Sequence, residues 1–234
     1  MTEARDHLAL VLDVPSADEA LALARRFRSW FGIAKVGYEL YAAAGPDVFP
    51  QLHDLGFRVF ADLKLHDIPT TVRRGATVLG RRGVDFLNFH AAGGVDMLRA
   101  GVEGLREGAL ERGGTVPTAL AVTVLTSDRD TSQFDERLDA AVESGCAGVV
   151  CSAHEITRVK ARASDFGTMV PGIRLPDSAR DDQARVATPG DAIALGADWL
   201  VVGRTLTAAD DPERAAEAVV RAVDDALART PTTR

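Results

Sequence analysis

Short apolar runs alternate with longer segments of helical periodicity from one end of the chain to the other. The runs are rich in valine, isoleucine, leucine and alanine and have few polar interruptions, which is typical of parallel strands that are covered on both faces. Eight runs predict strands, at Leu8–Val14, Ile33–Tyr38, Phe57–Leu65, Asp85–Ala91, Thr118–Leu125, Ala147–Ser152, Thr168–Ile173 and Asp198–Arg204.

The segments between these runs carry recognisable helix starts. Ser16–Glu19 is a capping-box pattern that predicts a helix over Ala17–Arg28. Thr188 before Pro189 places a cap residue ahead of proline at the first helical position. Small apolar residues at helical spacing predict a last helix over roughly Pro212–Ala228, followed by a loose tail.

Eight strands that alternate with helices, with no Ser/Gly linker to divide them, predict a (β/α)8 TIM barrel. A single barrel domain is expected over residues 1–234. An open doubly wound sheet is the alternative, and it accounts less well for eight evenly spaced units. In a barrel, chemistry takes place at the carboxyl ends of the strands, and phosphate often binds beyond strands seven and eight.

Composition and charge narrow the classes of function. With 46% hydrophobic and 26% charged residues, a soluble globular protein is expected. The formal charge is 27 − 34 = −7 and no basic run stands out, so nucleic-acid binding is not expected. No stretch reaches the ~18 apolar residues of a membrane span, and the N-terminus lacks the apolar core of a signal peptide. We therefore expect a cytoplasmic protein without a membrane partner.

Cys146 and Cys151 are the only cysteines. They form a C-x4-C pair with no second pair to complete a metal site. Two buried thiols are favoured over a disulfide or a zinc site.

Polar residues gather at the carboxyl ends of the predicted strands. A barrel built only for stability has no need to collect them at one rim. They are Asp13, Lys35, Asp62, Lys64, Asp67, His90, Thr126, Ser152, Arg174, Gly203 and Arg204.

Each of these residues has a structural alternative. Asp13 could cap the helix that follows it, but Ser16 already provides that cap, so a functional role is favoured for Asp13. Lys35 lies among apolar residues, where an ammonium without partners would be costly. An ion pair with Asp13 or Asp62 would explain it, either as a structural contact or as part of a sugar site. A hydrogen bond to backbone is the favoured interpretation of His90, and Ser152 stays open.

The end of the eighth strand has the chemistry of an anion site. A glycine at 203 lets backbone amides approach an anion, and Arg204 presents a forked donor. Arg174 offers the same chemistry one strand earlier, so a phosphorylated substrate is expected. The polar stretch LPDSARDDQARVATP that follows is long enough to form a lid, in which Gln183 would supply an amide to the phosphate.

The stretch ADLKLHDIPTT places two carboxylates and an ammonium at the end of the third strand. Asp62 and Lys64 project from the same face, and we expect Asp67 to lie close to them. An ammonium between carboxylates holds its proton, so Lys64 suits general-acid catalysis and stabilisation of a carbanion. Carboxylates beside it would repel a substrate carboxylate. The residues alone indicate decarboxylation or enolate chemistry on a phosphorylated acid.

The motifs DLKLHDIPTT, AVTVLTS, PGIR and VVGR resemble the orotidine 5′-monophosphate decarboxylase family, in its compact bacterial form. The likeness runs from LVLDV through VVGR, and the D-x-K-x-x-D-I-P-x-T match is specific. It implies conversion of orotidine 5′-monophosphate (OMP) to UMP, the last step of de novo pyrimidine biosynthesis, without a metal or an organic cofactor. Lys64 would protonate carbon 6 of the pyrimidine, and Asp62 would lie against the departing carboxylate.

The same resemblance implies roles for the other candidate residues. Asp67 would reach across the interface of a homodimer into the partner's site, so that the active sites are shared. By this likeness Asp13 and Lys35 would hold ribose hydroxyls, Thr126 would touch the base, Ile68 and Thr71 would contact the substrate, and Arg174, Gln183, Gly203 and Arg204 would gather the phosphate.

Two other interpretations compete with this one. 3-Keto-L-gulonate 6-phosphate decarboxylase and its hexulose-phosphate relatives share the D-x-K-x-x-D strand, but they bind magnesium and typically carry Glu where this chain has Lys35. A cation does not replace an anionic magnesium ligand, so Lys35 argues against them. A catalytically dead barrel that only binds nucleotides or a partner protein is disfavoured, because nothing is missing from the expected site.

Overall fold

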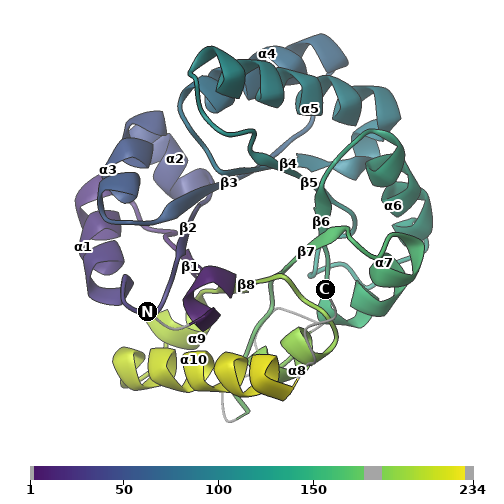
Figure 1. The fold of residues 1–234 in the computed structure, drawn as a ribbon. Helices are drawn as coiled ribbons and strands as arrows, with labels where there is room; N and C mark the ends of the chain where they lie inside the picture. The colour runs from purple at the N-terminus through teal and green to yellow at the C-terminus, as the bar shows by residue number, and fades with distance from the viewer. Residues whose placement is uncertain (1–2, 177–185, 230–234) are drawn as a thin grey trace.

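The computed structural model describes residues 3–176 and 186–229. Its strands form one closed parallel barrel in sequence order, in which the last strand pairs with the first (Figure 1). Each predicted run overlaps one strand, so the (β/α)8 prediction is confirmed. The strands are β1 (Leu8–Val11), β2 (Ile33–Val36), β3 (Arg58–Leu65), β4 (Phe86–His90), β5 (Thr118–Val122), β6 (Gly148–Val150), β7 (Gly167–Val170) and β8 (Trp199–Val202).

Helices surround the barrel on the outside (Figure 1). Two of them follow β2 and two follow β8, whereas a single helix follows each of the other strands in the described residues. The helices are α1 (Ala17–Phe27), α2 (Tyr38–Ala44), α3 (Val48–Asp54), α4 (Pro69–Arg81), α5 (Gly94–Glu111), α6 (Phe134–Glu143), α7 (Ile156–Arg162), α8 (Pro189–Ala194), α9 (Arg204–Thr207) and α10 (Pro212–Arg229).

The predicted helix starts are confirmed. The amide of Glu19 donates to Ser16 Oγ at 3.3 Å, and the amide of Asp191 donates to Thr188 Oγ1 at 3.2 Å. Pro189 is the first residue of its helix. The last helix ends one residue later than predicted.

Most strands are shorter at their carboxyl ends than the sequence predicted. Gly37 ends β2 and caps α2, so Tyr38 is helical. Arg204 likewise opens α9 after β8. Ile173 keeps only an isolated bridge to Ala187. Some apolar side chains beyond the ladders remain buried, as Ile173 does, whereas Tyr38 is 63% exposed. Burial therefore explains the longer apolar run at some strand ends but not at all of them.

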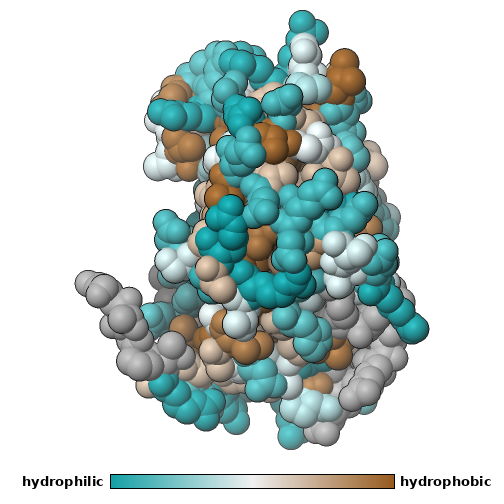
Figure 2. Space-filling model, turned by 90° about the vertical axis from the view of Figure 1, so that its right-hand side faces the viewer, coloured by the Kyte–Doolittle hydropathy of each residue, from teal (hydrophilic) through white to brown (hydrophobic). Residues whose placement is uncertain are grey.

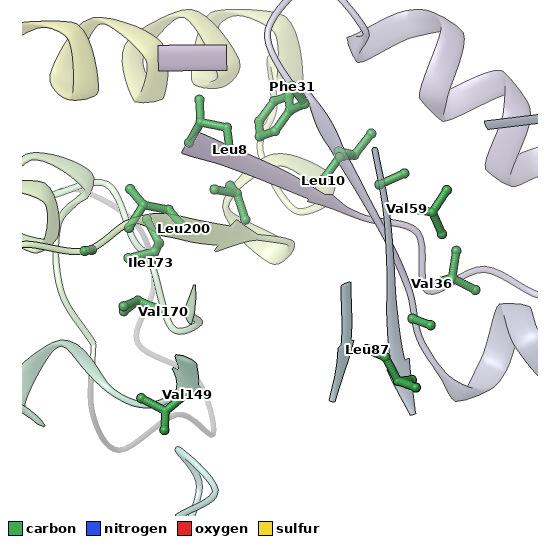
Figure 3. Packing of buried hydrophobic residues seen from close by; sticks show 14 of the residues in the cluster. Leu8, Leu10, Phe31, Val36, Val59, Leu87, Val149, Val170, Ile173 and Leu200 are labelled. Atoms are coloured by element: carbon green, nitrogen blue, oxygen red, sulfur yellow. The ribbon is translucent and has the colours of Figure 1, made fainter. Parts of the chain in front are cut away.

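Apolar side chains fill both sides of the barrel wall. The outer layer, between strands and helices, is shown in Figure 3, where Leu10, Val59 and Leu87 are examples from three strands. A separate cluster fills the barrel interior. This interior cluster consists of Ala9, Ile33, Phe60, Phe86, Leu120, Met169 and Val201.

The amino ends of β7 and β8 are joined by a polar contact that lies at the opposite end of the barrel from the predicted site. Asp198 Oδ2 accepts the amide of Thr168 at 2.7 Å and its hydroxyl at 3.0 Å. Lys160 Nζ lies 2.9 Å from the same oxygen. This contact is structural, because it satisfies backbone and buried polar groups away from the site.

The two cysteines are free and buried, as predicted. Burial raises the pKa of the Cys146 thiol to about 11. No helix within the described residues is long and apolar enough to cross a membrane. The face shown in Figure 2 is largely hydrophilic, with apolar residues in small groups.

Helices α4 and α5 lie side by side (Figure 1) and approach each other through glycines. A Cβ at Gly108 would lie 2.0 Å from the carbonyl oxygen of Thr77, and one at Gly80 would lie 2.5 Å from that of Leu105. Only hydrogen at these positions allows the two backbones to come so close. We call this contact the glycine seam; it consists of Gly80, Gly104 and Gly108.

Replacing Gly108 with alanine is expected to lower the free energy of unfolding by about 1–3 kcal/mol, because the added methyl group forces the helices apart. Gly75→Ala in α4 is the matched control, since the nearest atom to a Cβ there is 3.9 Å away. That change is expected to stabilise the protein by up to ~1 kcal/mol through helix propensity. Urea unfolding of the two variants measures both effects. Equal shifts in the same direction would contradict the role of the seam.

Candidate active site

A cavity of about 300 Å³ opens at the carboxyl ends of the strands. Its floor is the apolar cluster of the barrel interior, and its walls carry most of the polar residues predicted at the rim. The lining residues are Val11, Asp13, Lys35, Phe60, Asp62, Lys64, Val122, Val124, Leu125, Thr126, Val150, Pro171, Arg174, Val201, Gly203 and Arg204.

Four side chains of alternating charge form a row across this cavity, which we call the charged row: Asp13, Lys35, Asp62 and Lys64. Lys35 Nζ lies 2.9 Å from Asp13 Oδ1 and 3.3 Å from Asp62 Oδ2. Lys64 Nζ lies 2.6 Å from Asp62 Oδ1. Lys35 is only 6% exposed and pairs with both of the partners that the sequence proposed for it.

The carboxylate of Asp62 lies between the two ammonium groups. Burial pushes the pKa of Asp62 upward, but the charges of Lys35 and Lys64 and the hydrogen bonds from Lys64 and Asn88 bring this pKa below its ordinary value. Asp62 is therefore an anion at neutral pH. A negative group of a ligand placed beside it would be repelled.

Lys64 adopts an unusual backbone conformation. Its φ is +45°, and it is the one residue other than glycine with a positive φ in the described part of the chain. Such a conformation costs on the order of 1–3 kcal/mol and persists only where the surroundings enforce it. Strand β3 is also irregular here, because its pairing with β4 shifts register between Ala61 and Leu65.

Asn88 contacts the charged row, and it is not among the site residues predicted from the sequence. Its side chain donates from Nδ2 to Asp62 Oδ1 and accepts the amide of Lys64 at Oδ1, each at 2.7 Å. A signal was present in the sequence, since Asn88 interrupts the apolar strand FLNFH and a buried amide requires partners.

Gly37 and Tyr38 were also missed. A Cβ at Gly37 would lie 2.5 Å from Asp13 Oδ1 and 2.8 Å from Lys35 Nζ, so a side chain at this position would displace the ion pair. The hydroxyl of Tyr38 donates to the carbonyl of Leu63 at 2.7 Å, and Lys64 Nζ lies 5.7 Å from the centre of the Tyr38 ring. Both residues border the row on the side of α2.

Within one chain, Asp67 does not join the charged row. It is exposed, its Oδ1 accepts the amide of Ile68 at 2.6 Å, and it makes no ion pair with Lys64 among the described residues. Ile68 is 66% exposed, and Thr71 is an exposed residue in the first turn of α4. The expectation that all three charged residues of this stretch lie together therefore does not hold inside a single chain.

The expected anion-binding residues lie at the other wall of the cavity. Arg174 is buried, with Nη1 donating to the carbonyl of Ile173 at 2.9 Å. Arg204 and Gly203 line the same cavity, and Thr126 lies at its β5 side. Gln183, with residues 177–185 of the predicted lid, lies outside the described residues.

His90 and Ser152 have structural partners. His90 Nδ1 accepts the amide of Ala92 at 3.2 Å, which is the backbone contact that the sequence favoured. Burial lowers the pKa of His90, with further contributions from nearby positive charges. The amide and hydroxyl of Ser152 both donate to Glu155 Oε2, at 2.8 and 3.0 Å, in a capping box.

Comparison with known proteins shows similarity over most of the chain. Residues 6–219 match the model of the orotidine 5′-phosphate decarboxylase / HUMPS family. The chain is 46% identical over 225 residues to an orotidine 5′-phosphate decarboxylase of Nitratidesulfovibrio vulgaris, covering 91% of this chain and 95% of that one. It is 43% identical to that of Heliobacterium modesticaldum, covering 97% and 99%.

A solved structure is similar as well. The crystal structure of orotidine 5′-phosphate decarboxylase from Lactobacillus acidophilus matches with a TM-score of 0.75 at 34% sequence identity. The match covers 92% of this chain and 98% of the other.

Proposed function

The chain belongs to the orotidine 5′-phosphate decarboxylase / HUMPS family, and we propose that it converts OMP to UMP and CO₂ in pyrimidine biosynthesis. The charged row carries this proposal, because it places an ammonium and a carboxylate side by side at a cavity that Arg174 and Arg204 also line. The proposal includes a cytoplasmic homodimer and a reaction without metal or organic cofactor.

Decarboxylation breaks the bond between carbon 6 of the pyrimidine and its carboxylate. The electron pair stays on carbon 6 while CO₂ leaves, and a proton from Lys64 Nζ then forms the new C–H bond. The ammonium stabilises the developing carbanion before it donates, and solvent returns the proton to the amine. The 2.6 Å contact with Asp62 supports this role, because it holds the ammonium at the cavity wall.

Asp62 would contribute through repulsion of the substrate carboxylate. At ~4 Å and an effective dielectric constant of ~20, two like charges interact by about 4 kcal/mol. The repulsion disappears when the carboxylate becomes neutral CO₂. The lowered pKa of Asp62 supports the proposal, because it keeps this residue charged.

The remaining groups of OMP would bind along the same cavity. Asp13 and Lys35 would hold ribose hydroxyls, and Thr126 would contact the base. The buried guanidinium of Arg174 supports a phosphate site at the opposite wall, next to Arg204. Gly203 and Gln183 would complete it, while Ile68 and Thr71 would contact substrate at the rim.

The principal alternative lies within the same family, in magnesium-dependent decarboxylation of sugar phosphates such as 3-keto-L-gulonate 6-phosphate. Lys35 opposes it, because its ammonium lies between Asp13 and Asp62 and so brings positive charge to these carboxylates. A divalent cation at the same carboxylates would be repelled.

We expect the protein to convert OMP to UMP at the same rate before and after treatment with EDTA. The change of the ultraviolet spectrum as orotate becomes uracil measures the rate. Addition of MgCl₂ to the EDTA-treated protein is the control and is expected to have no effect. Activity on 3-keto-L-gulonate 6-phosphate that requires magnesium, without activity on OMP, would replace the proposed function by the alternative.

A further inference from the structure

We infer that Asn88 is a positioning residue for the reaction: its side-chain amide holds the Asp62 carboxylate and the Lys64 backbone in the arrangement that directs the ammonium into the cavity. This inference rests on the proposed function. Asn88 lies in β4 and is completely buried, and both polar atoms of its side chain are used in these two contacts.

The first argument comes from the pairing of β3 with β4. Ala61 pairs with Leu87 and Leu65 pairs with Phe89, so four steps along β3 correspond to two along β4. The backbone of β4 therefore has too few groups to satisfy residues 62–64. The side chain of Asn88 replaces the missing backbone partner, because its Oδ1 accepts the Lys64 amide as a carbonyl would.

The second argument comes from Lys64 itself. A lysine with φ of +45° requires surroundings that enforce this conformation. Asn88 fixes its amide, and Asp62 fixes its ammonium at 2.6 Å. Because the backbone amide and the ammonium of Lys64 are both held, its side chain is restricted to an orientation that lines the cavity.

The third argument comes from the orientation of the Asp62 carboxylate. Asn88 Nδ2 and Lys64 Nζ both donate to Oδ1, which leaves Oδ2 toward Lys35. Without the amide, the carboxylate could rotate about its terminal bond and the ammonium would follow it. Displacement of a reacting group by about 1 Å costs roughly 10²-fold in rate.

Two substitutions at this position separate positioning from simple support of the fold. Asn88→Leu keeps the branched shape and the number of side-chain heavy atoms but removes both hydrogen bonds. Asn88→Asp keeps the shape and one acceptor, and it reproduces the donor only when its carboxyl group is protonated. Two adjacent carboxylates raise the pKa of one member of the pair, so such protonation is accessible.

For Asn88→Leu we expect kcat for OMP to fall by about 10²-fold at every pH, with little change in KM. For Asn88→Asp we expect a similar loss at high pH. As the pH falls and the carboxyl group becomes protonated, kcat is expected to recover, so the pH profile of kcat for this variant rises toward low pH where the profile of the parent protein does not. Thr168→Val is the control for loss of a buried hydrogen bond far from the site, and it is expected to lower the melting temperature but retain the parent kcat.

Several outcomes would overturn the inference. Parent-like kcat in Asn88→Leu is one, and identical pH profiles of the Leu and Asp variants are another. A parent protein that is inactive on OMP would refute the proposed function instead. In that case a crystal structure of Asn88→Leu decides the question for Asn88, because an unchanged φ at Lys64 and an unchanged Lys64–Asp62 contact would overturn its positioning role.

Discussion

Replacing Lys64 with alanine is expected to lower kcat for OMP by at least ~10⁴-fold, because one change removes both the proton donor and the charge that stabilises the carbanion. The barrel is expected to remain folded, since the side chain is partly exposed at the cavity wall. Single-turnover conversion of OMP, followed by ultraviolet absorbance, measures the rate. Circular dichroism and the melting temperature report on folding.

The chain offers a matched control for this experiment. Lys160 also places its ammonium 2.9 Å from a carboxylate, that of Asp198, but at the opposite end of the barrel. Lys160→Ala is therefore expected to lower stability and to retain the parent kcat. A Lys64→Ala variant that keeps near-normal turnover would remove Lys64 from the mechanism, whereas equal loss in both variants would point to damage of the fold.

Mixing two inactive variants, Lys64→Ala and Asp67→Asn, is expected to restore activity if Asp67 acts across a dimer interface. A mixed dimer then contains one site with Lys64 from one subunit and Asp67 from the other. After random exchange of subunits in a two-fold symmetric dimer, roughly a quarter of the sites are intact. The exposed positions of Asp67 and Ile68 in the single chain motivate this experiment.

The controls are the two variants, each taken alone through the same conditions of subunit exchange. Decarboxylation of OMP is the readout, and mass spectrometry of intact dimers confirms that subunits have exchanged. Exchange without any recovery of activity would place Asp67 in the pocket of its own subunit. That result would leave the role of Lys64 unchanged.

The barrel could be predicted from the sequence because parallel strands buried on both faces leave uninterrupted apolar runs. The contact between Asp62 and Lys64 also followed from spacing, since residues two apart on a strand share a face. The pairing of Lys35 with both carboxylates could also be predicted, because a buried ammonium needs anionic partners. In each case, the sequence pattern around the residue carries the information.

Other features depend on which segments become neighbours in space. The contacts of Asn88 arise only because β3 and β4 pair with a shift in register, and spacing along the chain does not reveal that shift. The close approach of Gly37 to Asp13 joins segments that follow two different strands. Asp67 was expected beside Lys64, but the chain turns toward solvent after β3 ends, so the carboxylate leaves the row.

The glycine seam has a consequence for substitutions remote from the reaction. Helix α4 contains 13 residues and begins at Pro69, immediately after the exposed rim residues Asp67 and Ile68. A rod of that length measures about 20 Å, so a tilt of roughly 5° about its far end would move its near end by approximately 1.7 Å. A larger side chain between the two helices would thus displace the start of α4 and, with it, the rim residues at the mouth of the barrel.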